Sequence, residues 1–308
     1  MASKELLVDQ NGFFFIFCNF WSKVSVMIID GKEIAQKLIE ELKFKPGDWK
    51  GKFMGAMLVG EDPASVNFLK QKEKVAQELG ISFRLYKAPA GVKTDDLRAE
   101  IGMLSKPKNC GGFLVQLPLP EQINKHYVLN AVPKEKDIDC LGEQALGAFY
   151  TGRGKVAPPA VEAVEEILKS QIANGKSLRE LEFILIGAGF LIGKPVGFWL
   201  QNRAGEVTIY DSSVKNFHPN LKEADVVISG TGHPNLFSAK DLKEGALVID
   251  FGYASKGGKI SGDFDPSASS GRVHDGAEEK KVIYTKTPGG TGPILVAKLY
   301  ENFWKLNS

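Results

Sequence analysis

Two polar side chains lie in apolar segments, where their chemistry would be unusual. Lys72 lies on the apolar stripe of a helix predicted over residues 67–79, four residues after Phe68. Partial burial would lower the pKa of this lysine and make it a better proton donor or acceptor near neutral pH, although its side chain could instead extend to solvent. Gln116 lies inside a strand predicted over residues 112–119. A buried glutamine needs hydrogen-bond partners, and sites of α/β proteins gather at the carboxyl ends of strands; the alternative is a strand end that faces water.

Two neighbouring acids are a third candidate. Asp137 and Asp139 belong to the segment KDIDCLG at residues 136–142. Acids in a loop are usually solvated, so the pattern alone gives neither of them a role.

A glycine-rich turn between a strand and a helix predicts a dinucleotide site. Residues 183–195 read FILIGAGFLIGKP, so that an apolar strand leads into Gly187, Gly189 and Gly193. Glycines allow a tight turn and a close approach of the backbone to a pyrophosphate at the helix N-terminus. The spacing is GxGxxxG rather than GxGxxG, and a tight turn without a ligand is the alternative.

The acid after the next predicted strand bears on which dinucleotide is bound. The segment EVTIYD ends at Asp211, 24 residues after Gly187. An acid here can hydrogen-bond both ribose hydroxyls and would repel a 2′-phosphate, and no arginine lies beside it, so the sequence favours NAD over NADP. Asp211 or Ser212 could alternatively cap a helix. The order of strand, glycine loop, helix, strand and acid favours the cofactor site.

A framework of alternating strands and helices is predicted to position these residues. Short apolar runs alternate with helical patterns, which is typical of an α/β fold with a largely parallel sheet. The first block contains a helix after Thr94 and strands at residues 53–59, 81–86 and 112–119. Residues 134–159 have weak periodicity and are predicted as a connecting loop before a helix at 161–170. The second block resembles a doubly wound nucleotide-binding fold, with a long helix after Pro293 and four buried-type strands in EFILIGAG, EVTIYD, VVISG and ALVIDFG.

Bulk composition narrows the class of protein. The 308 residues are 43% hydrophobic and 25% charged with a net charge of +2, which indicates a globular core and argues against a nucleic-acid or membrane partner. The length suggests two domains. Three widely spaced cysteines and four scattered histidines fit neither a disulfide framework nor a metal site. We therefore expect no metal, and a reducing compartment.

The N-terminal segment contains a short apolar run. An apolar run at residues 12–21 is too short to span a bilayer as a helix, and the basic region and cleavage site of a signal peptide are missing from its flanks. An ordinary domain opening, MIIDGKEIAQKL, begins at Met27. We therefore expect residues 1–26 to be a translated leader or a misassigned start, rather than a segment that packs on a partner.

Several segments together resemble a divergent member of the bifunctional methylenetetrahydrofolate dehydrogenase/methenyltetrahydrofolate cyclohydrolase family. They occur in the family's order at similar spacing from Met27 to the C-terminus, and the PGGxGP turn, QLPLP and KD[VI]D are the most specific. Besides the pair Phe68 and Lys72, the segments are VGEDPAS (59–65), GFLVQLPLP (112–120), KDIDCLG (136–142), IGAGFLIGKP (186–195), EADVVISGTGHP (223–234), GALVIDFGY (245–253) and TPGGTGPIL (287–295).

The resemblance implies a fold, an activity and a setting. It implies two α/β domains with folate in the cleft between them. Residues 27–153 would be the catalytic and folate-binding domain, completed by a C-terminal helix at 289–308, and residues 154–288 the Rossmann-type NAD(P)-binding domain. The implied activity is oxidation of 5,10-methylenetetrahydrofolate to the methenyl form with NAD or NADP, then hydrolysis to 10-formyltetrahydrofolate. The implied protein is a cytoplasmic homodimer.

The resemblance also implies roles for single residues. Lys72 matches the catalytic lysine, Gln116 the glutamine that hydrogen-bonds the lysine or the substrate, and Asp139 the acid that holds the pterin ring. The positions expected to contact folate are Phe68, Pro288, Gly289 and Gly290. Together with the loop pattern above, the positions expected to bind the cofactor are Gly187, Ala188, Gly189, Gly193, Asp211, Ser212 and Tyr253.

Some site positions depart from the family pattern. Phe68 replaces a usual tyrosine, which keeps a stacking surface and loses a hydroxyl, while Cys140 replaces a glycine and Gly189 a serine. Three alternatives to the bifunctional enzyme stay open. They are an NAD-linked dehydrogenase without cyclohydrolase activity, a non-catalytic folate- or nucleotide-binding paralogue, and a dehydrogenase for a shikimate-type hydroxy acid. The last would not explain QLPLP and PGGTGP together.

Overall fold

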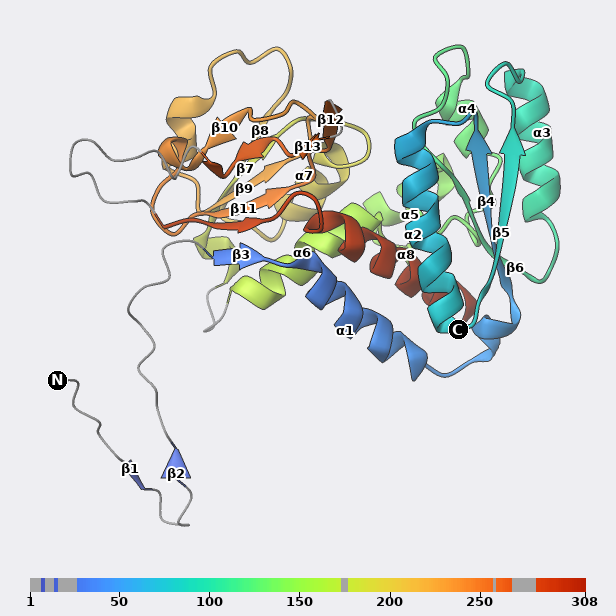
Figure 1. The fold of residues 1–308 in the computed structure, drawn as a ribbon, viewed down its shortest axis with the longest axis horizontal. Helices are drawn as coiled ribbons and strands as arrows, with labels where there is room; N and C mark the ends of the chain where they lie inside the picture. The colour runs from blue at the N-terminus through green and yellow to red at the C-terminus, as the bar shows by residue number, and fades with distance from the viewer. Residues whose placement is uncertain (1–6, 9–13, 16–26, 173–176, 257–258, 268–280) are drawn as a thin grey trace.

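Two parallel sheets organise the molecule. The computed structural model describes residues 7–8, 14–15, 27–172, 177–256, 259–267 and 281–308. A three-stranded and a six-stranded sheet lie in separate halves, with α6 (Pro159–Gln171) and α8 (Thr291–Asn307) running between them (Figure 1). The predicted two-domain α/β fold is confirmed. The predicted leader, residues 1–26, lies outside the described residues apart from the paired strands β1 (Leu7–Val8) and β2 (Phe14–Phe15).

The smaller sheet has the order β5-β4-β6, and both pairs of strands are parallel. Every residue of the central strand is buried, because helices cover both faces of such a sheet, and this explains its continuous apolar sequence FMGAMLV. The strands and helices of this half are β4 (Phe53–Val59), β5 (Ser82–Ala88), β6 (Cys110–Val115), α1 (Gly31–Lys43), α2 (Pro63–Leu79), α3 (Thr94–Ser105), α4 (Lys125–Leu129) and α5 (Glu143–Tyr150).

The larger sheet has the order β3-β15-β11-β9-β7-β8, and all its pairs are parallel. The chain places β8 on one side of β7 and β9 on the other, so the strand order reverses at the carboxyl end of β7, which is where open α/β sheets bind ligands. The strands, with the helix α7 that follows β7, are β3 (Met27–Ile29), β7 (Glu182–Ile186), β8 (Glu206–Tyr210), β9 (Val226–Ser229), β11 (Leu247–Asp250), β15 (Ile283–Thr285) and α7 (Gly193–Gln201).

Short elements complete the described chain. Two small pairings, β10 with β14 and β12 with β13, lie outside the main sheets. These elements and the single 3-10 turns are η1 (Asp48–Gly51), η2 (Leu178–Glu180), η3 (His218–Lys222), β10 (Phe237–Ser238), η4 (Ala239–Asp241), β12 (Ala254–Lys256), β13 (Lys259–Ser261) and β14 (Phe264–Asp265). None of the helices in the described part of the chain is long and apolar enough to cross a membrane.

The helix α8 connects the two halves. Tyr300 and Phe303 are fully buried in a core that includes residues of β4 and α1. On another side of α8, Lys298 and Lys305 form ion pairs with Glu166 and Glu162 of α6, at 2.8 Å and 2.6 Å. The division at residue 153 stays a prediction. The strand β3 lies within the predicted first domain, residues 27–153, but it pairs with β15 of the six-stranded sheet.

Several predicted elements differ in extent from those observed. The predicted loop 134–159 is wrong over α5, whose short sequence buries only Ala145 completely and so has weak periodicity. The predicted strand 112–119 ends at Val115, because Pro118 has no backbone N–H to continue a sheet. The strand β8 is an edge strand with no fully buried residue, so its prediction as a buried-type strand is wrong.

Candidate active site

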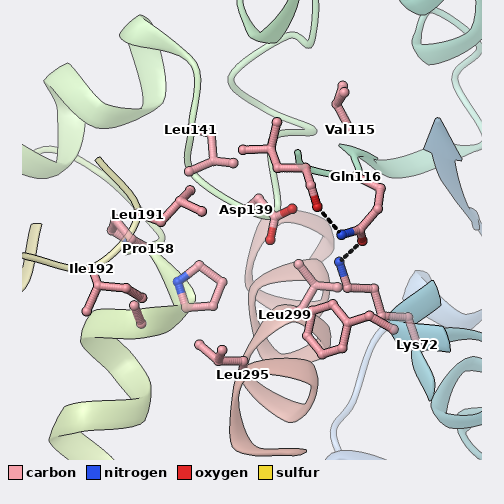
Figure 2. Close-up of a pocket in the computed structure, with 14 residues that line it drawn as sticks. Lys72, Val115, Gln116, Asp139, Leu141, Pro158, Leu191, Ile192, Leu295 and Leu299 are labelled. Carbon is pink, nitrogen blue, oxygen red and sulfur yellow. Dashed lines mark hydrogen bonds between the residues drawn. The ribbon is translucent and has the colours of Figure 1, made fainter. Parts of the chain in front are cut away.

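A cavity of about 240 Å³ lies between the two halves of the molecule. Its walls come from α2, the end of β6, the loop before α5, the start of α6, the loop after β7, and α8. Among the described residues that line it, only Lys72 and Asp139 are ionisable, and nearly all the others are apolar. Figure 2 shows both side chains pointing into the same space, beside Gln116. Burial in an apolar cavity strongly shifts the pKa values of charged groups, and such shifts are typical of reactive sites.

Helix α2 carries Lys72 into this cavity. The helix begins at Pro63, and the Asp62 side chain accepts a 2.8 Å hydrogen bond from the backbone N–H of Ser65, which caps its first turn. Lys72 is only 5% exposed, so the alternative of a lysine that extends to solvent is wrong. The Tyr300 hydroxyl of α8 donates a 2.6 Å hydrogen bond to the backbone carbonyl of Lys72, which ties this turn of α2 to the C-terminal helix.

The Lys72 ammonium group has a polar and an aromatic neighbour. Its Nζ donates to Gln116 Oε1 at 3.1 Å and lies 4.8 Å from the centroid of the Phe68 ring. The Gln116 Nε2 donates to the carbonyl of Leu117 at 2.7 Å, which turns Oε1 toward the lysine (Figure 2). Burial lowers the pKa of Lys72, and the Asp139 carboxylate partly opposes that shift. The neutral amine is therefore more accessible here than on a surface lysine.

The two acids of the KDIDCLG segment have different surroundings. The Asp137 Oδ2 accepts hydrogen bonds from the backbone N–H groups of Leu141, at 3.0 Å, and Gly142, at 2.7 Å, so this acid holds the loop together. Burial raises the pKa of Asp137 to about 7. Asp139 instead lines the cavity, and burial raises its pKa while Lys72 lowers it. Cys140, directly after Asp139, has φ +53°, a conformation that favours glycine, so the loop keeps this strained turn with a cysteine side chain.

A second cavity, of about 870 Å³, adjoins the first. Phe68 and Gln116 line both cavities, and the predicted folate-contacting turn Pro288, Gly289 and Gly290 lines the larger one. Tyr253, predicted to bind the cofactor, also lines the larger cavity. The predicted lysine, glutamine, acid, aromatic and turn positions are therefore brought together.

The turn at residues 288–290 is held by close backbone packing. A Cβ atom on Gly31, at the start of α1, would lie 1.6 Å from the carbonyl oxygen of Gly290. Gly289 has φ +99°, which a side chain would strain. Lys286, just before the turn, forms an ion pair with Asp30, the N-cap of α1. These contacts hold one wall of the larger cavity against α1.

The predicted dinucleotide loop lies at the point where the strand order reverses. Gly187 follows β7 with φ +102°, and its backbone N–H donates to the carbonyl of Tyr210 at 2.7 Å. A Cβ on Gly193 would lie 1.8 Å from the Gly187 carbonyl oxygen, so only glycine permits this close turn into α7. A Cβ on Gly189 would meet nothing within 4 Å, which leaves an open backbone face beside the small side chain of Ala188. This cradle fits a pyrophosphate at a helix N-terminus.

The acid after β8 lies beside this cradle. Asp211 directly follows Tyr210, whose carbonyl is bonded to Gly187. Both Asp211 and Ser212 are exposed. The Asp211 Oδ1 accepts from the backbone N–H and the hydroxyl of Ser213, at 2.8 Å and 2.5 Å, and these bonds lower the pKa of the acid. Asp211 therefore stabilises its own turn, a role similar to the helix cap that was the alternative interpretation. It is also an ionised group next to the glycine loop.

Sequence reasoning missed much of the cavity wall. Leu191 and Ile192 of the dinucleotide loop line the cavity of Lys72, as do Pro158 at the start of α6 and Leu295 and Leu299 of α8. The three consecutive apolar residues 190–192, in a loop expected to face a phosphate, could have revealed this wall. Loops rarely carry consecutive large apolar residues without burying them. The cofactor loop and the lysine cavity thus share one wall.

Two family models match most of the chain. The model described as the tetrahydrofolate dehydrogenase/cyclohydrolase catalytic domain matches residues 29–139, and the one described as the NAD(P)-binding domain of the same enzymes matches residues 158–308. The chain is similar to the bifunctional protein FolD of Nitratiruptor sp., with 32% identity over 282 residues that cover 90% of this chain and 96% of the relative.

Solved structures agree with these matches. The bifunctional FolD methylenetetrahydrofolate dehydrogenase/cyclohydrolase of Campylobacter jejuni superimposes with a TM-score of 0.81 and 30% identity, covering 92% of this chain and 98% of that one. The Trypanosoma brucei methylenetetrahydrofolate dehydrogenase-cyclohydrolase, complexed with NADP cofactor and inhibitor, superimposes with a TM-score of 0.79 and 26% identity, with the same coverage.

Proposed function

Because this chain belongs to the tetrahydrofolate dehydrogenase/cyclohydrolase family, we propose that it catalyses both reactions of that family. It oxidises 5,10-methylenetetrahydrofolate to 5,10-methenyltetrahydrofolate and hydrolyses this product to 10-formyltetrahydrofolate. The observation that carries the proposal is the buried Lys72, bonded to Gln116 and near Asp139, in a cavity that the dinucleotide loop helps to close.

The folate substrate occupies the two adjoining cavities. Asp139 holds the pterin ring, because a carboxylate in an apolar cavity is a strong acceptor for ring N–H and amino groups. Phe68, which lines both cavities, stacks on the aromatic ring in the middle of the substrate. The turn at Pro288, Gly289 and Gly290 contacts the same molecule from the opposite wall.

Hydride transfer depends on alignment and exclusion of water. A bound nicotinamide dinucleotide supplies the hydride acceptor, and Gly187, Gly189 and Gly193 supply the backbone cradle for its pyrophosphate. The apolar side chains of Leu191 and Ile192 keep water from the space between the two reacting rings. No protein group has to give up or take a proton in this step, because the methylene carbon loses only a hydride.

Hydrolysis depends on Lys72 as a proton acceptor and donor. The lowered pKa makes the neutral amine available to take a proton from the water whose oxygen bonds to the methenyl carbon. The resulting ammonium group returns a proton to N5 as the bond between that carbon and N5 breaks. The remaining hydroxyl proton leaves to solvent, and the formyl group stays on N10. Gln116 accepts a hydrogen bond from Lys72 and so holds the amine in one place.

The preferred dinucleotide is NAD. The support is the ionised Asp211 directly after the residue whose carbonyl binds Gly187, because this charge repels a 2′-phosphate. The Trypanosoma brucei relative was solved with NADP, so the proposal of NAD rests on the residues of this chain alone. The proposal includes the homodimeric state and cytoplasmic location that the resemblance implies, which light scattering of the purified protein and fractionation of the source cells test.

An absorbance assay with both dinucleotides tests the proposed function. Purified protein receives 5,10-methylenetetrahydrofolate with NAD or NADP, while reduced dinucleotide and methenyltetrahydrofolate are followed separately. We expect reduced dinucleotide, faster with NAD, without lasting methenyl signal, and a control without protein in which added methenyltetrahydrofolate persists. Accumulation of methenyltetrahydrofolate would show that the protein is a dehydrogenase without cyclohydrolase activity. This is the second candidate function, and it is favoured by Phe68, which lacks the hydroxyl of the usual tyrosine. No turnover by folded protein would contradict the proposal.

A further inference from the structure

The dinucleotide loop sends one aromatic side chain across to the folate half. Phe190 packs against a buried apolar cluster whose other described members all lie between residues 53 and 141. Its ring is perpendicular to that of His126, at 89° with 4.8 Å between centroids, and the Nζ of Lys125 lies 5.1 Å from its ring centroid. Both partners belong to α4. The loop is thus attached to the other half at its tip.

The two residues after Phe190 form part of the wall beside Lys72. Leu191 and Ile192 line the cavity, and Leu191 is 42% exposed, so its own burial does little to hold it there. The loop before them contains Gly187 and Gly189, which restrict the backbone least. Ile192 packs on the core of its own half, so the packing of Phe190 on α4 is the contact that ties this loop to the folate half.

We propose that Phe190 is a positioning residue for hydride transfer. By fixing the dinucleotide loop against α4, it fixes the distance between the nicotinamide and the folate methylene carbon. The inference rests on the proposed function. A displacement of about 1 Å can slow an aligned reaction about 10²-fold. Hydrolysis needs no dinucleotide, and its groups Lys72, Gln116 and Asp139 all lie in the folate half, so a small shift of the loop wall changes hydrolysis less than it changes hydride transfer.

The test compares both reactions in matched variants. Phe190→Ala removes the contact, and Phe190→Leu keeps an apolar side chain in the same place. Phe198→Ala is the control, because Phe198 of α7 also packs across to the folate half, with ring centroids 5.6 Å from Phe149 and 4.5 Å from Tyr150 of α5, and lines neither cavity. Each variant is assayed for dehydrogenation at saturating substrates, and for hydrolysis of methenyltetrahydrofolate without dinucleotide.

We expect Phe190→Ala to lower the dehydrogenation kcat about tenfold or more while hydrolysis stays within about twofold. The isotope effect with methylene-deuterated substrate should increase, because hydride transfer becomes rate-limiting. Phe190→Leu should recover most of the rate, and Phe198→Ala should leave the ratio of the two activities unchanged.

Three results would overturn the inference. They are an equal fall of both activities in Phe190→Ala, an equally altered ratio in Phe198→Ala, and wild-type dehydrogenation in Phe190→Ala. A wild-type protein that transfers no hydride would instead overturn the proposed function, and the inference with it. The wild-type measurement therefore separates the two failures.

Discussion

Replacing the buried lysine by methionine separates its chemistry from its packing. Methionine has a similar length and an apolar end, so Lys72→Met keeps the side-chain volume in the cavity and removes the ammonium group. The hydrogen bond to Gln116 Oε1, 3.1 Å in the wild type, is lost. Asp139 also loses the charge that opposes its raised pKa, so the pKa of this carboxyl rises further.

The expected effects differ greatly in size. A proton-transfer group contributes about 10²–10⁴-fold to a rate, and hydrolysis should fall by that factor. Leaving the Gln116 acceptor unpaired costs about 1–3 kcal/mol of stability, and removing a buried charge offsets part of that cost. The fold should therefore persist, since domains have about 5–15 kcal/mol of stability. Dinucleotide binding should be unchanged, because the loop at residues 187–193 belongs to the other half of the molecule.

Hydrolysis is measured directly by the loss of methenyltetrahydrofolate absorbance, with dinucleotide binding and thermal unfolding measured on the same protein. Lys70→Met is the matched control, because Lys70 lies on the same helix, is exposed and lines neither cavity. Wild-type hydrolysis in a folded Lys72→Met protein would refute the role of this lysine. An equal loss in Lys70→Met would show that the effect comes from altering the helix.

Three further changes test other parts of the account. Asp211→Ser should raise kcat/KM with NADP relative to NAD by severalfold, and an unchanged ratio would mean that the acid only stabilises its turn. Gly31→Ala should displace Gly290 and raise the KM for folate, with a stability loss of about 1–3 kcal/mol, whereas Gly102→Ala inside α3, whose Cβ meets nothing within 4 Å, should leave this KM unchanged and should not lower the stability. Burial raises the pKa of Asp137 to about 7, so the folded protein binds this proton more tightly than the unfolded chain, and the stability that this gives is lost as pH rises from about 4 to about 7. Asp137→Asn should therefore flatten the fall in unfolding free energy between about pH 4 and about pH 7, measured by urea denaturation; an unchanged slope would contradict the shifted pKa.

Local pattern was enough to find the polar groups of the cavity. Lys72 was visible because it interrupts the apolar stripe of α2, and Gln116 because it interrupts a predicted apolar strand. Both signals come from neighbours within a few residues. The glycine loop was equally local, since the close approach of Gly193 to Gly187 depends on a turn of seven residues.

The rest of the site depends on contacts between distant segments. Nothing near Leu295 or Leu299 in the sequence indicates that α8 lines a cavity with α2, more than 200 residues earlier. The segment KDIDCLG does not reveal that Asp137 binds loop N–H groups while Asp139 faces the cavity, because both are acids in one loop. The family resemblance, rather than the spacing, pointed to Asp139.

The proposed function requires that hydride leaves the methylene carbon of folate for the nicotinamide and that the oxidised carbon is then hydrolysed. The most direct measurement uses 5,10-methylenetetrahydrofolate with both hydrogens of the methylene carbon replaced by deuterium, and follows deuterium into the products by mass spectrometry. We expect one deuterium on the reduced dinucleotide and the other on the formyl group of 10-formyltetrahydrofolate. Reduced dinucleotide without deuterium, or no reduced dinucleotide at all, would contradict the proposed function.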